Sequence, residues 1–500
     1  MAHTTKECDV ISLHNNDGQV IECVRIRVNR WTKSLRELIM TETYSLAEND
    51  ELKRLPARAY LVGALTQFGV GLYSPFIQAY LIDMQMALRG VQNFVEQGAF
   101  RSVGNFAPTV LQPVWGATSD RARNTKAFVA FGTMTGLLVV YMFLWAATPL
   151  ELIILYTIQS ILFSIQIPTW LSLVGGLMDE SNRGNELGKL GLATNIASLT
   201  ATLISGFIAV LPPLVPFLRG LFGDLGSVLF PIQMGEQAFR EVYYGPFFFT
   251  AIVGIISSLL SVSIREYPKR NDGPRKFPPI HKLLSQPGDF RRFCFIAVFY
   301  SFAMSLAWPY FIIVQKTWLN NSNLEIAIAS AAMTLSIIIF TIPFGRLSDK
   351  VGRKPLILLG RGLLFLVPIM YAFAQNVYYI YVANILAGFC VASGMNAITA
   401  YIYDISPEEE RASYLAVYNT FTGVVYLFGS LIAGVMGQII LVVLGSEYVS
   451  VYIMLILSGV LRFFASFFYL LVREPRTYTS TFWLELRARL PGRRHDADIV

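Results

Sequence analysis

The stretch Phe344–Pro355 reads FGRLSDKVGRKP and decides the fold. It places two glycines, an aspartate and several basic residues in one short segment. The runs on either side, IASAAMTLSIIIFTIP and LILLGRGLLFLVPIMYAFA, contain almost no charge. A similar segment, WGATSDRARNTK at Trp115–Lys126, also lies between two apolar runs. Both segments are therefore interpreted as charged turns between apolar helices.

The composition is that of a membrane protein. Of 500 residues, 54% are hydrophobic and only 15% are charged, with a mean hydropathy of +0.51, whereas soluble domains carry roughly 25% charged residues. Because lipid leaves every backbone donor and acceptor to be satisfied within its own segment, apolar runs of about 20 residues predict membrane-spanning helices. The twelve predicted spans are 59–84, 97–118, 127–147, 150–177, 190–211, 242–264, 293–315, 326–347, 355–373, 377–403, 414–440 and 450–471.

The distribution of lysine and arginine predicts the orientation of the chain. The formal net charge is +7. If the N-terminus is cytoplasmic, most basic residues between the spans fall in cytoplasmic loops, and only Arg89, Arg219, Arg240 and Lys316 fall in the opposite loops. By the positive-inside rule we expect both termini in the cytoplasm, in a multi-pass protein of the plasma membrane.

Polar segments divide the chain into regions. Residues 1–56 form a cytoplasmic extension, either a small module or a tail that lies on acidic lipid. The basic, proline-rich segment 265–292 has the composition of a linker. We therefore expect six-helix bundles at 57–264 and 293–472, with a cytoplasmic tail at 473–500.

A weak repeat relates the two halves. Gly116–Asp120 matches Gly345–Asp349 at an offset of 229 residues, and Arg183 matches Arg411 at an offset of 228. LISG at 203–206 falls on LIAG at 431–434 at that same offset. Since each half has an even number of spans, the two copies point the same way through the membrane, which is a parallel repeat.

The segment GRLSDKVGRK at Gly345–Lys354 resembles the cytoplasmic loop signature of the major facilitator superfamily. The N-terminal half carries a degraded copy, GATSDRARNTK, between the second and third predicted spans. The resemblance extends over the core from about Ala59 to Val472. It implies an all-α membrane fold of twelve transmembrane helices in two parallel-repeat six-helix bundles, and transport by alternating access.

The signature is expected to act as a latch between the halves. Gly345 would let its helix end approach a neighbour, and Asp349 would accept hydrogen bonds from donors at a neighbouring helix start. The resemblance implies that Arg353 faces an acidic residue on the tenth span, for which Asp404 is the candidate.

In the N-terminal copy, Asn124 stands where Arg353 stands in the C-terminal copy. Either Arg121 or Arg123 is then left to meet Asp179 or Glu180. The gating candidates of both copies are Gly116, Asp120, Arg123, Asp179, Arg183, Gly345, Asp349, Arg353, Asp404 and Arg411.

Polar and aromatic residues at mid-depth are the candidate solute contacts. The resemblance implies that the first, fourth, seventh and tenth spans line the path, with contributions from the second and fifth. Amides in lipid are costly unless paired, so hydrogen bonding between helices is the alternative role for each. The candidates are Gln67, Asn105, Gln159, Gln166, Asn195, Tyr300, Trp308, Asn384 and Asn396. Trp308 would stack on a ring of the solute or anchor its helix at the membrane interface.

Acidic residues and histidines are absent from the middle of the predicted spans. Proton-driven transport normally needs a titratable group there. Coupling to protons is therefore disfavoured, and the remaining candidate carriers are Asp83, Glu325 and Asp404 near span ends.

Three arginines lie within predicted spans. Arg101 is expected to pair with Asp83 or Glu96. Arg361 and Arg462 are expected to extend along their helices to the inner membrane surface.

The chain is predicted to be a secondary active or facilitative transporter of a small polar or amphipathic solute. Two alternatives stay open: a multidrug/proton antiporter that exports its substrates, and a sensor of this family that no longer transports. The sequence contains no Ser/His/Asp set and no phosphate-binding loop that would indicate an enzyme. The four cysteines lack the spacing of metal ligands. We expect no cofactor and no nucleic-acid partner. The protein would be a monomer whose partners are the solute and the bilayer.

The orientation can be tested with single cysteines introduced in the loops. A membrane-impermeant thiol reagent should label cysteines at Arg123, Arg275 and Arg411 only from the cytoplasm, and a cysteine at Arg219 only from outside, because basic loops are retained in the cytoplasm. Labelling of position 275 from outside would contradict the assignment of spans.

Overall fold

The computed structural model describes residues 55–122, 124–178, 183–210, 214–229, 239–264, 288–407 and 410–475. Helices make up the regular secondary structure of these residues, and none of them forms a strand. Contacts divide the chain into a small unit, Met1–Pro56 with Leu177–Glu186, and a large unit, Ala57–Gly176 with Leu187–Val500. Within the small unit the Leu55 N–H donates to the Glu186 carboxylate at 3.1 Å. Most of the predicted extension, linker and tail lies outside the described residues.

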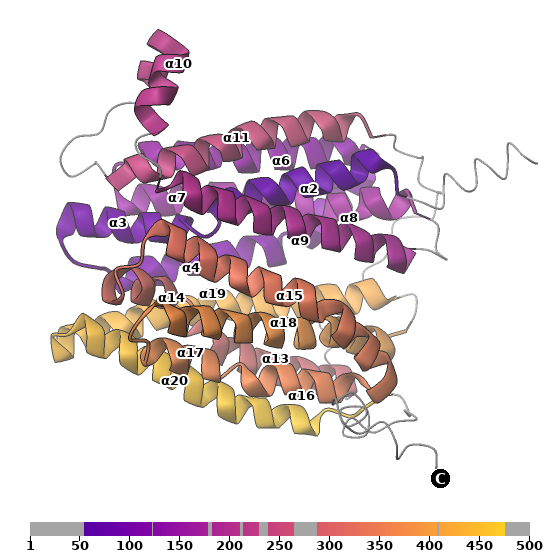
Figure 1. Ribbon diagram of the computed structural model, residues 1–500. Coiled ribbons are helices and arrows are strands. Elements are labelled where there is room, and N and C mark those ends of the chain that lie inside the picture. The colour runs from indigo at the N-terminus through magenta and orange to yellow at the C-terminus, as the bar shows by residue number, and fades with distance from the viewer. Residues whose placement is uncertain are drawn as a thin grey trace, which may run out of the picture. The chain divides into compact units, whose positions relative to one another are not determined.

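The N-terminal bundle begins with two broken spans (Figure 1). The first span consists of α2 (Ala57–Tyr73) and α3 (Ile77–Arg89), and the second of α4 (Phe94–Val110) and α5 (Gln112–Ala122). The remaining helices of this half are α6 (Thr125–Met142), α7 (Pro149–Ser164), α8 (Gln166–Gly176), α9 (Arg183–Ile208), α10 (Leu214–Leu229) and α11 (Glu241–Val262).

The C-terminal bundle repeats this order. Its first span consists of α13 (Asp289–Ser305), α14 (Phe311–Ile313) and the π-helix η3 (Val314–Trp318). The remaining helices are α15 (Asn323–Val351), α16 (Arg353–Leu363), α17 (Leu366–Ala372), α18 (Val377–Ile405), α19 (Arg411–Leu444) and α20 (Glu447–Phe467).

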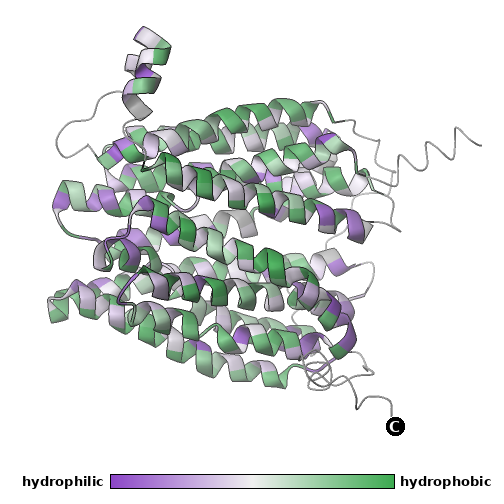
Figure 2. Cartoon of the chain, viewed as in Figure 1, coloured by the Kyte–Doolittle hydropathy of each residue, from purple (hydrophilic) through white to green (hydrophobic). Residues whose placement is uncertain are grey.

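In the described part of the chain, nine helices are long and apolar enough to cross a membrane. The first, second and seventh predicted spans do not qualify because each is interrupted, by the breaks between α2 and α3, α4 and α5, and α13 and α14. With these counted, each half supplies six passes, in agreement with the predicted all-α membrane fold. Hydrophobic residues dominate along the helices, and hydrophilic ones gather towards their ends (Figure 2).

Prolines account for the breaks in the first span of each half. Pro75 lies between α2 and α3, and Pro309 lies between α13 and α14. Proline has no N–H and its ring clashes with the preceding turn, so it ends or kinks a helix. Each break lies in the first span of its half, although the two prolines are 234 residues apart and the repeat has an offset of 228 or 229. Each break leaves backbone carbonyls that need partners from elsewhere.

Each bundle has an aromatic core of its own. In the N-terminal bundle the Tyr80 ring meets Tyr243 and Phe247 with centroids 5.0 and 5.7 Å apart. In the C-terminal bundle the Phe293 ring meets Tyr401 and Tyr418 at 4.7 and 5.7 Å. Such tilted and edge-on ring pairs add to the stabilisation from burial alone. The two cores also touch, because the Phe94 ring of the N-terminal half packs on Tyr310 of the C-terminal half with centroids 5.5 Å apart.

The two bundles approach closely where α4 packs on α19. A Cβ at Gly98 would lie 2.6 Å from the Ser430 carbonyl oxygen and 2.8 Å from the Gly434 Cα. Real side chains do not make contacts this short, so glycine is needed for the two backbones to touch. Deeper in the bundle, the Ser102 hydroxyl donates to the Leu427 carbonyl at 2.6 Å.

Replacement of Gly98 tests this contact. Gly98→Val should push α4 away from α19, so the distance between spin labels on the two helices should increase, with a strain of about 1–3 kcal/mol where the bundles stay together. The matched control is Gly191→Val, since no atom lies within 4 Å of a Cβ there. An unchanged distance and an unchanged unfolding temperature for Gly98→Val would contradict the close approach.

Candidate functional site

Charged side chains form separate clusters at the two ends of the helices of the large unit. We call the end at which α15 meets α16 the motif end, because Gly352 of the opening sequence lies there between Val351 and Arg353. The opposite end, where α3 ends at Arg89 and α15 begins at Asn323, is called the far end. Gly352 has φ 98°, which disfavours any residue with a side chain.

At the motif end, Arg353 joins the ends of three helices. Its Nε lies 3.2 Å from Asp404 Oδ2 on α18, and its Nη1 lies 2.6 Å from Asp349 Oδ1 and 2.8 Å from Ser348 Oγ on α15. The side chains of Arg353 and Asp404 are 8% and 6% exposed, whereas that of Asp349 is 71% exposed. The ion pair between Arg353 and Asp404 is therefore the buried centre of this cluster.

Two details of the predicted latch are corrected. Asp349 accepts from the Arg353 side chain, whereas we expected it to accept from donors at a helix start. A Cβ at Gly345 would meet no atom within 4 Å, so Gly345 does not serve close packing in this structure. The backbone N–H of Lys354, in the first turn of α16, donates to Glu474 at 2.8 Å, which supplies the carboxylate that the helix start favours.

The N-terminal copy of the motif is built differently. Asn124, at the position of Arg353, caps α6 by accepting from the Ala127 N–H at 3.3 Å. An amide at this position stabilises a helix start without any charge. A Cβ at Gly116 would meet only Pro168, at 3.9 Å, which is an ordinary contact. The other N-terminal gating candidates have side chains outside the described part: Asp120, Arg121, Arg123, Asp179, Glu180 and Arg183. In the C-terminal copy, Arg411 Nε donates to the Tyr403 carbonyl at 3.2 Å.

At the far end an ion pair crosses from one bundle to the other. Lys316 Nζ lies 2.8 Å from Asp83 Oδ2, with the two side chains 14% and 23% exposed. The Tyr243 hydroxyl donates a short hydrogen bond to the same Asp83 oxygen. Asp83 and Tyr243 belong to the N-terminal bundle and Lys316 to the C-terminal bundle. Neither Lys316 nor Tyr243 was among the predicted site residues.

Four hydrogen bonds accompany this ion pair, three between neutral groups and one to the Glu447 carboxylate. Gln92 Nε2 lies 2.8 Å from Thr317 Oγ1, and the Gln92 N–H donates to Glu447 at 3.2 Å. The Phe94 N–H donates to Gln438 at 3.0 Å. Gln78 Nε2 donates to the Pro309 carbonyl at 2.8 Å, which satisfies an acceptor in the break between α13 and α14. All four bonds join the two bundles.

Arg101 does not pair with a carboxylate, contrary to expectation. Its Nε donates to Gln78 Oε1 at 2.7 Å, and the same glutamine binds the Pro309 carbonyl. Glu96 pairs instead with Arg89, with Nη1 and Oε1 2.8 Å apart. Helical spacing alone could not show that Asp83 is unavailable to Arg101, because the partner of Asp83 is Lys316 of the other bundle.

Several predicted solute contacts are already hydrogen-bonded inside the protein. Gln159 donates to the Tyr73 hydroxyl at 3.0 Å, and Asn384 donates to the Tyr371 hydroxyl at 2.7 Å. Asn105 donates to the Arg101 carbonyl one turn earlier at 2.7 Å, and the buried Tyr300 hydroxyl donates to the Arg361 carbonyl at 2.8 Å. These four side chains serve packing between or within helices in this structure.

The other predicted contacts have no such partners. Within the described residues, Gln67, Gln166, Asn195 and Asn396 make no side-chain hydrogen bond; Gln166 is buried, and the other three are partly or fully exposed. Trp308 lies in the break after α13, where its ring packs on Tyr426 with centroids 4.6 Å apart. Trp308 thus packs on a helix of its own bundle.

Arg361 and Arg462 stay within the C-terminal bundle and do not reach the membrane surface. Arg462 is 2% exposed and donates to the carbonyls of Leu364 and Met304 at 3.4 and 2.8 Å. Arg361 lies over the Tyr300 ring, 4.8 Å from its centroid. The prediction that both extend to the surface was wrong because it took lipid as their surroundings. Aromatic and carbonyl groups of neighbouring helices surround them instead.

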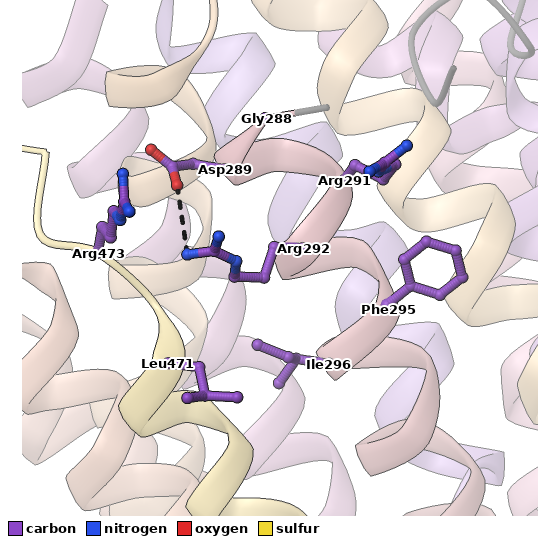
Figure 3. Close-up of a pocket in the computed structure, with 8 residues that line it drawn as sticks. All are labelled: Gly288, Asp289, Arg291, Arg292, Phe295, Ile296, Leu471 and Arg473. Atoms are coloured by element: carbon purple, nitrogen blue, oxygen red, sulfur yellow. Dashed lines mark ion pairs between the residues drawn. The ribbon is translucent and has the colours of Figure 1, made fainter. Parts of the chain in front are cut away.

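A separate, shallow pocket of about 630 Å³ lies at the motif end of α13 (Figure 3). Its basic side chains are Arg291, Arg292 and Arg473, and an Asp289–Arg292 pair at 3.9 Å lies among them. None of the predicted solute contacts lines it. Among the described residues, no group of histidine, cysteine or acidic side chains could hold a metal ion.

Known proteins resemble the chain in sequence and structure. A family model described as Major Facilitator Superfamily matches residues 59–315 and 293–493. An uncharacterized MFS-type transporter of Methanocaldococcus jannaschii is 24% identical over 428 residues, 84% of this chain and 98% of that protein. The class H tetracycline resistance protein of Pasteurella multocida is 34% identical over only 105 residues, 20% of this chain and 25% of that protein.

Solved structures share the fold. A bacterial homolog to the human lysosomal transporter Spinster superimposes with a TM-score of 0.67 and 15% identity, over 85% of this chain and 98% of that one. The family model covers both bundles, and the motif, the repeat and the helix order agree with it. The chain belongs to the Major Facilitator Superfamily and is a membrane transporter of small solutes.

Proposed function

We propose that the chain moves a small polar or amphipathic solute by alternating access, with the observed structure closed at the far end. The cluster of polar contacts around Asp83 and Lys316 carries this proposal. Most of each apolar core lies within one bundle, whereas the contacts between the bundles at this end are largely hydrogen bonds and an ion pair, together with the Phe94–Tyr310 ring pair. Water can replace such polar contacts, so the far end can open while each bundle stays intact.

The positive-inside rule supports a cytoplasmic motif end and an external far end. In this orientation residues 1–56, the linker 265–292 and the tail 473–500 are cytoplasmic, and the transporter works as a monomer in the plasma membrane. Closure at the far end then corresponds to a state that exchanges solute with the cytoplasm. The Arg353 cluster would belong to closure of the other end.

The solute contacts are proposed to come from the side chains that lack internal partners. Gln67, Asn195 and Asn396 offer amides that are at least partly exposed, and Trp308 offers a ring. The four bonded residues, Gln159, Asn384, Asn105 and Tyr300, are assigned to packing. A polar solute would restore the hydrogen bonds that the free amides lack.

Export of drugs is the second candidate, and the resistance protein of Pasteurella multocida favours it. A wide aromatic surface made by Phe68, Tyr73, Trp308 and Tyr310 would support it further. Tyr73 and Tyr310 are instead buried, and the Tyr310 hydroxyl is bonded to the Ala433 carbonyl. A small solute therefore remains the first candidate, and a sensor without transport the third.

Cross-linking across the far end tests alternating access. Gln92→Cys and Thr317→Cys, joined by a short bifunctional thiol reagent, should block all solute flux into proteoliposomes, because the bundles can no longer separate there. A cleavable reagent should restore flux after cleavage. A panel of sugars, nucleosides, amino acids and drugs supplies the solutes. Undiminished flux through the fully cross-linked protein would refute the mechanism.

The ion pair at the far end should set how often that end opens. Lys316→Met leaves Asp83 without its cationic partner, which we expect to shift the equilibrium by about 1–3 kcal/mol, or roughly 5–150-fold, towards opening. Ser102→Cys, at a buried position whose hydroxyl donates to Leu427 of the other bundle, would then react faster with a thiol reagent from that side.

The matched control for Lys316→Met is Arg89→Met. It breaks the Arg89–Glu96 pair at the same end but within one bundle, and should leave the labelling rate unchanged. The double variant Asp83→Lys/Lys316→Asp, in which the two charges are exchanged, should again be labelled as slowly as the wild type. Equal rates in the wild type and in Lys316→Met would show that the pair does not hold the end closed.

Transport should not require a proton gradient. The acidic candidates near span ends are engaged: Asp83 with Lys316, Asp404 with Arg353, and Glu325 in the capping box of α15 with Ser322. We therefore expect solute to equilibrate across vesicles without a pH gradient. A pH-sensitive dye inside the vesicles checks this. Stoichiometric proton movement with flux, lost in Asp83→Asn, Glu325→Gln or Asp404→Asn, would contradict the prediction and identify the carrier.

A further inference from the structure

Two arginines lie side by side in the C-terminal bundle without an acidic partner. Arg361 on α16 and Arg462 on α20 both contact Met304: Arg361 Nη1 donates to its sulfur at 3.7 Å, and Arg462 Nη2 donates to its carbonyl at 2.8 Å. Among the described residues neither one forms an ion pair with a carboxylate. Uncompensated charge within a membrane protein is costly and marks pathways of ions or substrates. The two charges therefore call for an anion from outside the chain.

The two arginines have different surroundings. Arg462 is almost fully buried, and its donors satisfy the carbonyls of Leu364 and Met304, which lie at the ends of α16 and α13. Arg462 thus has a structural role at two helix breaks. Arg361 is more exposed than Arg462 and donates to the Met304 sulfur at 3.7 Å, a weak acceptor, while its Nε–H has no partner.

The surroundings of Arg361 are aromatic. The Tyr300 ring lies 4.8 Å from the guanidinium carbon, and Tyr469 packs edge-on against Tyr300 with centroids 5.7 Å apart. Tyr418 and Tyr426 interact electrostatically with the Arg361 charge. Cation–π contact holds a guanidinium in place and leaves its N–H groups free for an oxyanion. Tyrosine hydroxyls add donors that an oxyanion can also use.

This cluster adjoins the surface between the bundles. Thr422, Gly423 and Tyr426 share a face of α19, because residues three and four apart are neighbours on a helix. A Cβ at Gly423 would collide with Thr109 of α4, which shows that this face meets the N-terminal bundle. The Tyr426 ring also packs against the ring of Trp308, which is one of the proposed solute contacts. Tyr426 therefore links the two groups, because its ring packs on Trp308 and it interacts electrostatically with Arg361.

We propose that Arg361, with Tyr418 and Tyr426, binds the oxyanion of an amphipathic organic anion whose apolar or ring portion packs on Trp308. This inference rests on the proposed transport function and names the class of its substrate. A guanidinium binds carboxylate and phosphate groups through paired hydrogen bonds. The shared chemistry is an oxyanion next to an apolar group, carried by a soluble metabolite or by a lipid headgroup.

Binding of three matched probes to the full chain in phosphatidylcholine nanodiscs tests the site. The probes are 1-naphthoate, 1-naphthyl phosphate and the neutral 1-naphthamide, with chloride and inorganic phosphate as anions that lack a ring. One or both naphthyl anions should bind at least about tenfold more tightly than the amide, as a charge-assisted hydrogen bond predicts. Arg361→Gln should abolish this preference. Equal binding of anions and amide to the wild type would overturn the proposal.

Two variants separate a lost site from a lost fold. Arg292→Gln removes the same charge from the exposed Asp289 pair and should keep the anion preference. Arg361→Lys keeps the charge without the paired donors and should retain part of the preference. A preference that persists in Arg361→Gln, or that is lost equally in Arg292→Gln, would also overturn the proposal. Phosphatidylglycerol nanodiscs that abolish binding of the soluble anions would identify the lipid headgroup as the source.

Flux measurements keep this inference distinct from the proposed function. Entry of 1-naphthyl phosphate into wild-type proteoliposomes, lost in Arg361→Gln, would support both. Anion binding through Arg361 without flux of any solute would support the site and contradict transport. Flux of a neutral solute together with equal binding of the anions and the amide would support transport and contradict the site.

Discussion

A bilayer offers no hydrogen-bond partner to a protein, and the arrangement of this chain depends on that constraint. Prolines break the first span of each half, and the freed carbonyls need donors from the protein. The Pro309 carbonyl is satisfied by Gln78 of the other bundle. Separating the bundles at the far end therefore exposes an acceptor that only water can satisfy. Contact between the bundles at this end and exclusion of water from the helix break are therefore coupled, because the same Gln78–Pro309 hydrogen bond contributes to both.

The same constraint bears on the polar contacts between the bundles at the far end, which accompany close helix packing and the Phe94–Tyr310 ring pair. Aromatic packing around Tyr80 and Phe293 depends on burial and does not survive wetting. The Asp83–Lys316 pair and the Gln92–Thr317 bond can exchange partners with water at modest cost. Rigid bodies joined by exchangeable contacts can alternate between two arrangements without unfolding.

Most of the fold was predictable from sequence, whereas only part of the site was. Length and hydropathy predict the spans because lipid imposes both, and the motif predicts the pair of Arg353 and Asp404. The partner of Asp83 was missed because it belongs to the other bundle, and no periodicity within one helix sets that pairing. Arg361 and Arg462 were misplaced for a related reason. Whether an arginine faces lipid or tyrosines depends on helix rotation, which composition does not determine.

The halves keep a common backbone plan and differ in their charges. Both break their first span at a proline, yet Asn124 caps a helix where Arg353 forms ion pairs. A shared backbone lets either end close by a similar movement of the bundles. Arginines without a carboxylate partner occur in both described halves, with Arg101 on Gln78 in the N-terminal half and Arg361 and Arg462 in the C-terminal half. Because the cationic surface belongs to the C-terminal bundle, a bound anion would move with that bundle, and the N-terminal bundle would act mainly as the opposing wall.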